Sequence, residues 1–151
     1  MSAPPTFAIA FDTREQLPWS FSDEIRVTRA TLPAGDYAPV GAETRCAIER
    51  KSLADFIGSI THERERFKRE LAKLAAYEFA AVLIEANVAD VEERRYRAQV
   101  HPNSVLGSAV AITTDFVPVI WAGDRANAAA LCARFLRRFW TTHVLSTTEA
   151  A

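Results

Sequence analysis

Cysteine is scarce in this chain, which has two cysteines, Cys46 and Cys132, among its 151 residues. Both stand in apolar stretches and neither has the partner spacing of a zinc site, so a disulfide framework and a structural zinc site are not expected. Reduced and buried thiols in a cytoplasmic protein are the expected state.

Long apolar runs are also missing. No stretch approaches the roughly 20 apolar residues that a membrane-spanning helix needs, so no membrane partner is expected. The segment 1–5 has neither the basic region nor the apolar region of a signal peptide. A Gly-rich phosphate loop and a Ser or Cys nucleophile elbow are absent as well, which leaves a hydrolase of a small phosphorylated substrate without support.

Neither sign of charge dominates, because 18 Lys and Arg residues face 19 Asp and Glu residues and the net charge is -1. The overall charge therefore does not indicate a strongly basic nucleic-acid-binding domain. The basic residues are clustered, however, at 64–69, 94–97 and 134–138. Such clusters can follow a phosphate backbone, and a solvated helix face is an equal alternative for each of them.

The pattern of apolar residues predicts one domain in which strands and helices alternate. Hydrophobic residues make up 49% of the chain and charged residues 25%, as in ordinary globular domains. Strands are predicted over 7–11, 26–32, 37–40, 45–51, 80–85 and 116–121. Helices are predicted after Ser52, from 63 to about 78, from 102 to 114, and from a cap at Asp124 or Asn127 to about 140. The segment 87–99 is predicted to be a mobile loop or a short exposed helix.

The most informative segment is Glu49-Arg50-Lys51, which ends a predicted apolar strand. A charge buried beside a core is costly unless a metal or an opposite charge compensates it. Thirteen positions earlier, Asp36 follows Gly35 at a predicted turn. Two carboxylates placed side by side repel each other, and a divalent cation relieves that repulsion. Because strand side chains alternate, Lys51 is expected on the same face as Glu49.

These residue types indicate a metal-dependent site that cleaves phosphodiester bonds. We expect Asp36 and Glu49 to bind Mg²⁺, or Mn²⁺ as a substitute, with Asp12 binding a second metal or the first through water. Lys51 is expected to position the attacking water or to stabilise the transition state. Arg14 and Arg50 could contact phosphate or support the carboxylates.

A simpler interpretation remains open, in which the same residues are unrelated turn and strand-end charges. Asp36 could be an Asx-turn residue, Asp12 a loop-start residue and Asp55 a helix-capping residue. The segment Glu49-Arg50-Lys51 resists this interpretation, because three consecutive charges beside a core are rare.

The motifs resemble the nuclease domain of the XPF family of structure-specific endonucleases, which includes Hef-like nucleases. The family signature is a Gly-Asp, a variable stretch, then Glu-Arg-Lys, three residues and Asp. The matching residues are Asp12-Thr13-Arg14-Glu15, Gly35-Asp36-Tyr37, Ile48-Glu49-Arg50-Lys51 and Asp55. The resemblance extends from about residue 7 to residue 138, and it sets the expected domain at 7–142 between flexible segments 1–6 and 143–151.

The resemblance implies a restriction-endonuclease-like α/β fold, a single domain with a central mixed sheet flanked by helices. It also implies Mg²⁺ or Mn²⁺ dependence and cleavage of branched, flap or fork DNA in repair, recombination or phage DNA processing. The implied catalytic residues are Asp12, Arg14, Glu15, Asp36, Glu49, Arg50, Lys51 and Asp55. Arg64 is an implied DNA contact, and we expect Arg66 and Lys68 in the same cluster to bind DNA with it.

The resemblance further implies a homodimer, for which Phe135, Phe139 and Trp140 are candidate contacts; core packing is an equal alternative for them. No helix-hairpin-helix sequence is found in these residues, so duplex anchoring is expected from the basic clusters, a second subunit or a DNA-targeting partner protein. Short versions of this domain look like bacterial or phage proteins, which suggests a cytoplasmic, nucleoid-associated location. A non-catalytic DNA-binding scaffold partner of another nuclease is the main alternative, although all the acidic and lysine positions of the signature are present.

Overall fold

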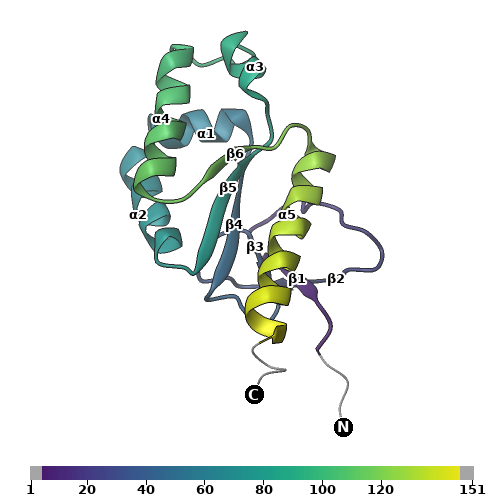
Figure 1. Ribbon diagram of the computed structural model, residues 1–151. Coiled ribbons are helices and arrows are strands. Elements are labelled where there is room, and N and C mark those ends of the chain that lie inside the picture. Colours follow the sequence, from purple (N-terminus) through teal and green to yellow (C-terminus); the bar gives the residue numbers. More distant parts are fainter. Residues whose placement is uncertain (1–4, 147–151) are drawn as a thin grey trace.

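Six strands form one mixed sheet at the centre of the structure, a computed structural model that describes residues 5–146 (Figure 1). Their bounds are β1 Ala8–Asp12, β2 Arg26–Ala30, β3 Tyr37–Pro39, β4 Cys46–Lys51, β5 Phe79–Ile84 and β6 Val119–Trp121. The order across the sheet is β2-β1-β3-β4-β5-β6. β3 is antiparallel to both of its neighbours, and the other pairs are parallel. The predicted single α/β domain with a central mixed sheet is confirmed.

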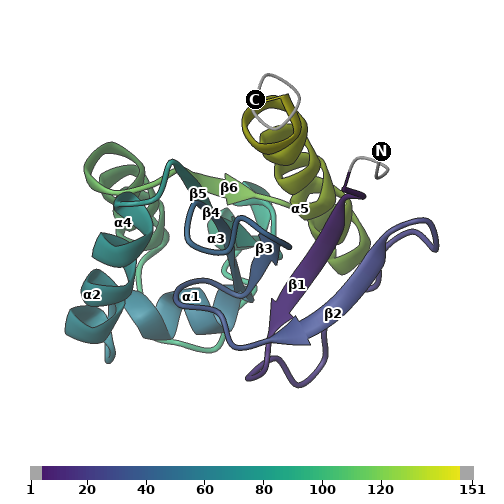
Figure 2. The same cartoon turned by 90° about the horizontal axis from the view of Figure 1, so that it is seen from below.

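Helices cover both faces of this sheet. Their bounds are α1 Leu53–Ile60, α2 Arg64–Ala75, α3 Val88–Glu92, α4 Pro102–Asp115 and α5 Arg125–Phe139, followed by the π-helical turn η1 Trp140–Leu145. α1, α2 and α4 lie on one side of the sheet and α5 lies on the other (Figure 2). The polar segment 87–99 contains α3, so the short helix was the correct alternative.

Two apolar clusters fill the space between the sheet and the helices, and β4 contributes to both. Ala47 packs with Phe56 and Phe67 on the α1–α2 side. Cys46 and Ile48 face the other cluster, beneath α5. Because successive strand residues point to opposite faces, this alternation also sends Glu49 and Lys51 to the α2 side and Arg50 to the other.

Local capping follows the sequence closely at two helices. The side chain of Ser52 accepts a hydrogen bond from the Asp55 backbone N–H at 3.1 Å, as predicted for the start of α1. At α5 the cap is Asp124, whose carboxylate accepts from the Asn127 backbone N–H at 2.8 Å. Each side-chain oxygen satisfies a backbone N–H that lacks a partner within the helix.

β2 is shorter than predicted. The strand was expected over 26–32, but it ends at Ala30, and Arg26–Arg29 are all exposed. β2 is an edge strand that pairs only with β1. At the opposite edge lies β6, and Pro118 directly precedes its first residue, a position where a strand tolerates proline.

The flexible segments predicted at 1–6 and 143–151 lie mostly outside the described residues. Within residues 5–146, η1 continues the helical structure past the predicted domain end at 142. Between these limits, no helix is long and apolar enough to span a membrane.

Candidate active site

The start of β3 and the end of β4 bring two carboxylates together. Tyr37 pairs with Ile48 in the antiparallel register, which places Asp36 opposite Glu49. The Asp36 backbone N–H donates to the Ile48 carbonyl at 2.8 Å, and the Asp36 carboxylate accepts from the Arg50 backbone N–H at 2.8 Å. The sheet ladder itself therefore holds the Asp36–Glu49 pair.

Both carboxyl groups of this pair are electrostatically unfavourable in their ionised form. Burial raises the pKa of Asp36, and the nearby Glu15 carboxylate adds to the shift. Glu49 is only 8% exposed, and burial together with the Asp36 carboxylate raises the pKa of Glu49 well above its ordinary value of 4.5. The pair is thus a place where a bound cation would be strongly favoured.

Lys51 extends from the same face of β4. Its Nζ lies 5.0 Å from the centre of the Phe67 ring on α2, a cation–π contact that restrains the side chain. The side chain borders the same cleft as Asp36 and Glu49. The predicted placement of Lys51 beside Glu49 is confirmed.

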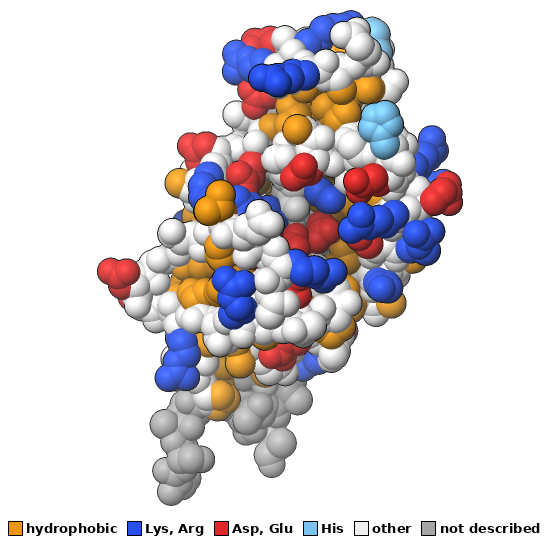
Figure 3. Space-filling view, turned by 180° about the vertical axis from the view of Figure 1, so that it is seen from behind, with side chains coloured by type: hydrophobic (Ala, Val, Ile, Leu, Met, Phe, Trp, Pro, Cys, Tyr) orange, Lys and Arg blue, Asp and Glu red, His pale blue; other side chains and the backbone are white. Residues whose placement is uncertain are grey.

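The cleft has a volume of about 300 Å³ between the end of β4, the Pro33–Asp36 turn and α2. Acidic side chains lie in a recess bordered by Lys and Arg side chains on one face of the molecule (Figure 3). On the α2 side the polar residues of the border are Arg66, Glu70 and Lys73. These three follow a helical spacing, so the face could have been read from the sequence, but only the fold shows that it meets β4.

Asp12 ends β1 beside this cleft, but it does not meet Asp36 and Glu49 as a third member of the pair. Its side chain is fully buried, with one oxygen accepting from the Leu32 N–H at 2.9 Å. The other oxygen accepts from the backbone N–H of Arg14 at 3.1 Å and from its Nε at 2.6 Å. Burial acts against ionisation, yet these hydrogen bonds hold the pKa of Asp12 below its ordinary value. Asp12 therefore anchors Arg14, which borders the cleft.

On the opposite face of β4, Arg50 is held by a polar network. Its guanidinium binds Glu15 at 2.9 Å and Glu85 at 2.5 Å. It also lies 4.8 Å above the ring of Trp19. Burial acts to lower the pKa of Arg50, but Glu85 and Glu15 together raise it. Arg50 and Glu15 thus brace the strand that carries Glu49 and Lys51.

Three members of this network were missed as site residues. The Trp19 indole donates to Glu85 at 2.7 Å and its backbone N–H donates to the Tyr37 hydroxyl at 2.8 Å. That hydroxyl donates in turn to Glu15 at 2.8 Å. Glu85 could have been found, because it follows a buried strand that runs parallel to β4. Trp19 stands in an irregular loop and carries no sequence signal.

The remaining predicted residues lie outside the cleft. Asp55 is exposed in the first turn of α1, and among residues 5–146 its carboxylate contacts no other predicted site residue. Arg64 and Lys68 border a different groove, between α2 and α4. The predicted DNA-binding set is therefore divided, with Arg66 alone at the cleft.

The donor set suits Mg²⁺ or Mn²⁺. Mg²⁺ commonly binds to one or two carboxylates and completes its shell with water and substrate phosphate oxygens. Asp36 and Glu49 supply those two carboxylates. Burial raises the pKa of both, and the nearby Lys51 ammonium offsets that rise only in part. In the described part of the chain, no group of three or more His, Cys, Asp or Glu side chains is positioned to hold a metal. The pair fits one directly bound cation.

Gly35 is the residue that lets the chain turn into this site. Its φ is +73°, and a Cβ at this position would lie 2.9 Å from the Ala47 Cβ and 3.2 Å from the Ile48 carbonyl oxygen. Gly35→Ala therefore adds left-handed backbone strain to a clash in a packed sheet. We expect a loss of about 3 kcal/mol in the free energy of unfolding, measured by urea denaturation.

Two other glycines separate the causes. Gly41 also has a positive φ, +94°, but nothing lies within 4 Å of its added Cβ, so Gly41→Ala should cost about 1 kcal/mol. Gly58 lies in α1 with open space around it, and Gly58→Ala should stabilise the protein by about 0.5 kcal/mol or more. Equal losses for Gly35→Ala and Gly41→Ala would contradict the clash.

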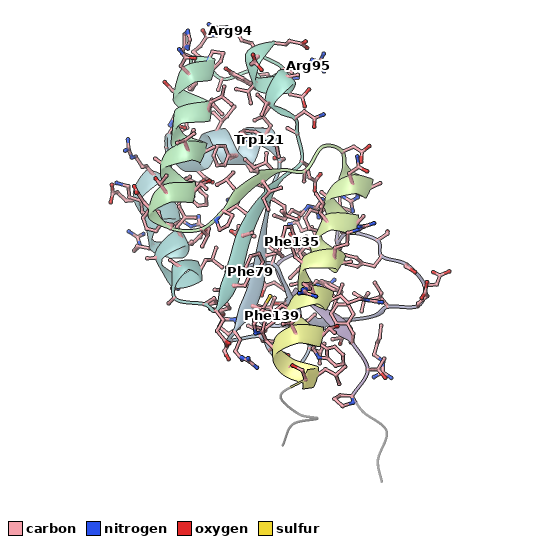
Figure 4. The ribbon with its side chains drawn as sticks, viewed as in Figure 1. Phe79, Arg94, Arg95, Trp121, Phe135 and Phe139 are labelled. Atoms are coloured by element: carbon pink, nitrogen blue, oxygen red, sulfur yellow. The ribbon has the colours of Figure 1, made fainter. Side chains whose placement is uncertain are left out.

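The aromatic residues considered as dimer contacts differ in burial. Phe139 and Trp140 belong to the core beneath α5, which is the alternative that the sequence left open. Phe135 is half-buried and stacks on Phe79 of β5, with ring centres 5.4 Å apart. Phe79, Phe135 and Phe139 lie together beside the end of α5 (Figure 4). They border a recess of about 310 Å³.

Comparisons with known proteins identify related domains. A family model described as the ERCC4 domain matches residues 11–135. Among solved structures, XPF from Aeropyrum pernix is similar with a TM-score of 0.67 and 23% sequence identity, over 90% of this chain and 62% of that chain. This chain thus spans less than two thirds of the length of that structure. No curated protein sequence matches significantly.

Proposed function

We propose that this chain, which belongs to the ERCC4 domain family, is a metal-dependent endonuclease. Membership of that family supports the function of a DNA nuclease in repair. We infer branched, flap or fork DNA as its substrate, in repair, recombination or phage DNA processing. The observation that carries the proposal is the buried Asp36–Glu49 pair with Lys51 on the same strand face, in a cleft bordered by cations.

Two expectations from the sequence are confirmed. The motifs suggested an XPF-type nuclease domain, and the family model covers residues 11–135. The structural likeness to archaeal XPF shows a restriction-endonuclease-like fold. The roles of individual residues, the metal and the DNA structure that is cut belong to the proposal.

The proposed division of labour follows the geometry. Asp36 and Glu49 would hold Mg²⁺ or Mn²⁺, which when bound supplies polarisation of the scissile phosphate and activation of the attacking water. Lys51 orients that water and stabilises negative charge in the transition state. Arg50 and Glu15 keep the strand end in register, and Asp12 holds Arg14 at the rim of the cleft for a phosphate.

DNA contact at the cleft is assigned to Arg14, Arg66 and Lys73, which border it. Cations near the carboxylate pair allow the anionic DNA backbone to approach despite the acidic centre.

A homodimer is the proposed assembly, with the Phe79–Phe135 stack as its contact. Gel filtration with and without DNA checks the assembly.

Incubation of the purified chain with flap, fork, Holliday-junction and linear duplex DNA, in Mg²⁺ or in EDTA, tests the function. We expect cleavage of the branched DNAs in Mg²⁺ and none in EDTA. Binding of branched DNA without cleavage in Mg²⁺ or Mn²⁺ would overturn the proposal and favour the non-catalytic scaffold.

A further inference from the structure

Helix α2 carries cations on two different sides. Arg66 and Lys73 face the cleft, whereas Arg64 and Lys68, four residues apart on one stripe, face the groove between α2 and α4. The proposed nuclease function, on which this inference rests, uses the first side only. The second side carries Arg64 and Lys68, which the sequence predicted to bind DNA but which the cleft does not use.

The two groove cations are available to a ligand. Arg66 pairs with Glu63 and Glu70. Arg64 and Lys68 are exposed and make no ion pair with any residue between 5 and 146. The cluster at 94–97 differs, because Arg95, beside Arg94 near α3 (Figure 4), pairs with Asp90 at 2.9 Å.

The floor of the groove is apolar. Phe67, Leu71 and Ile112 form it from the core, and Phe116 borders it half-buried after the end of α4. Its volume is about 190 Å³. A ligand with a flat apolar ring and an anionic group would fit this groove. Its ring would lie on the apolar floor, and its anionic group would lie near Arg64 and Lys68.

Ser59 gives a second, independent indication of a ligand. The residue is only 3% exposed and borders the groove. Its hydroxyl has no hydrogen-bond partner in the part of the chain that the structure describes. Between residues 5 and 146, every side-chain N or O atom that solvent cannot reach has a hydrogen-bond partner. The unpaired Ser59 hydroxyl must therefore be reachable, and the groove is the cavity that Ser59 borders. A buried hydroxyl facing a ligand site can donate to or accept from a base edge.

We propose that the α2–α4 groove binds a nucleotide of single-stranded DNA. Arg64 and Lys68 contact its phosphates, the base stacks on Phe116 above the apolar floor, and Ser59 hydrogen-bonds to the base edge. Cationic grooves with stacking surfaces are the common way in which proteins bind single strands without sequence preference. The groove and the cleft lie on either side of one helix, roughly 10–12 Å across, so one substrate can reach both.

Fluorescence anisotropy in EDTA tests the groove separately from cleavage. The probes are a fluorescein-labelled oligothymidylate and a blunt duplex of equal length. For the double variant Arg64→Ala/Lys68→Ala we expect about tenfold weaker single-strand binding, and a log–log salt slope shallower by about 1.4. Phe116→Ala should weaken single-strand binding by about tenfold without changing that slope. Duplex affinity should change by less than about twofold in both variants.

Arg69→Ala is the matched control, because Arg69 is exposed on α2 and borders neither the groove nor the cleft. It should bind the single strand like the wild type. Unchanged single-strand affinity in the double variant and in Phe116→Ala overturns the groove and leaves the proposed function intact if the wild type cuts. The single-strand proposal would also be overturned if the protein binds deoxythymidine monophosphate to saturation but does not bind the oligothymidylate. The groove would then be a site for a free nucleotide.

Discussion

Replacing Lys51 by methionine is expected to lower the rate of DNA cleavage by about 10³-fold. The ammonium is a positive charge in the same cleft as the Asp36–Glu49 pair. Methionine removes this charge and keeps a side chain of similar length. Contact with the Phe67 ring is retained through the sulfur, so the fold should survive. Single-turnover cleavage of a flap DNA in Mg²⁺ measures the rate, and thermal unfolding checks the fold.

DNA affinity separates a catalytic role of Lys51 from a binding role. In EDTA, Lys51→Met should bind flap DNA within about threefold of the wild type, because a single phosphate contact contributes little to total affinity. Arg69→Met, at an exposed position outside the cleft, should cut normally. If Lys51→Met keeps its turnover to within about tenfold, Lys51 is not the group that stabilises the transition state.

Glu49→Gln should stop cleavage and, at the same time, stabilise the metal-free protein at neutral pH. The glutamine keeps the shape of the side chain but removes the buried charge beside Asp36. We expect turnover to fall by about 10³-fold because the anionic ligand is lost. Stabilisation by added Mg²⁺, visible as a rise in the unfolding temperature of the wild type, should disappear in this variant.

The direction of the pH effect follows from the raised pKa of Glu49. Below its ordinary value of 4.5 the carboxyl is protonated in both the folded and the unfolded chain, so it does not affect stability. As the pH rises above that value, the unfolded chain releases the proton while the folded chain retains it, and the free energy of unfolding falls. The stability of the metal-free wild type should therefore drop relative to Glu49→Gln between pH 4.5 and neutral pH.

Urea denaturation of both proteins in EDTA across this pH range measures the difference. Glu78→Gln is a suitable control, because Glu78 lies at the surface and pairs with Arg45. The hydrogen bond from Arg45 lowers the pKa of Glu78, which is the opposite direction to Glu49. Removing that carboxylate should not produce a gain in stability with rising pH. Parallel pH profiles for the wild type and Glu49→Gln would contradict a strained carboxylate pair.

Local sequence patterns predicted most of β4, the strand that carries Glu49 and Lys51. An apolar run that ends in Glu49-Arg50-Lys51 predicts a strand with charged residues at its end. A glycine before Asp36 specifies a turn with positive φ. Side-chain alternation alone then assigns Glu49 and Lys51 to one face and Arg50 to the other, as the structure shows.

Where the sequence could not predict the site, the missing information was a contact between distant segments. Glu70 and Lys73 reach the cleft only because α2 packs against β4. The interaction of Trp19 with Glu85 joins residues 66 positions apart, and an irregular loop carries no periodicity that would indicate it. Asp12 looked like a metal ligand because it ends a strand, but its neighbours Arg14 and Leu32 occupy its oxygens.

The sequence by itself determined the order of the strands and the long helices, the helix cap at Ser52, and the three charged positions that make cleavage chemistry conceivable. Local backbone preferences and side-chain periodicity act over a few residues, and these features need nothing more. Only the tertiary structure decided that Asp36 and Glu49 share one buried environment, and that the cations of α2 divide between a cleft and a groove. Burial and Coulomb interactions depend on distances between segments far apart in the chain, and those distances are set by packing.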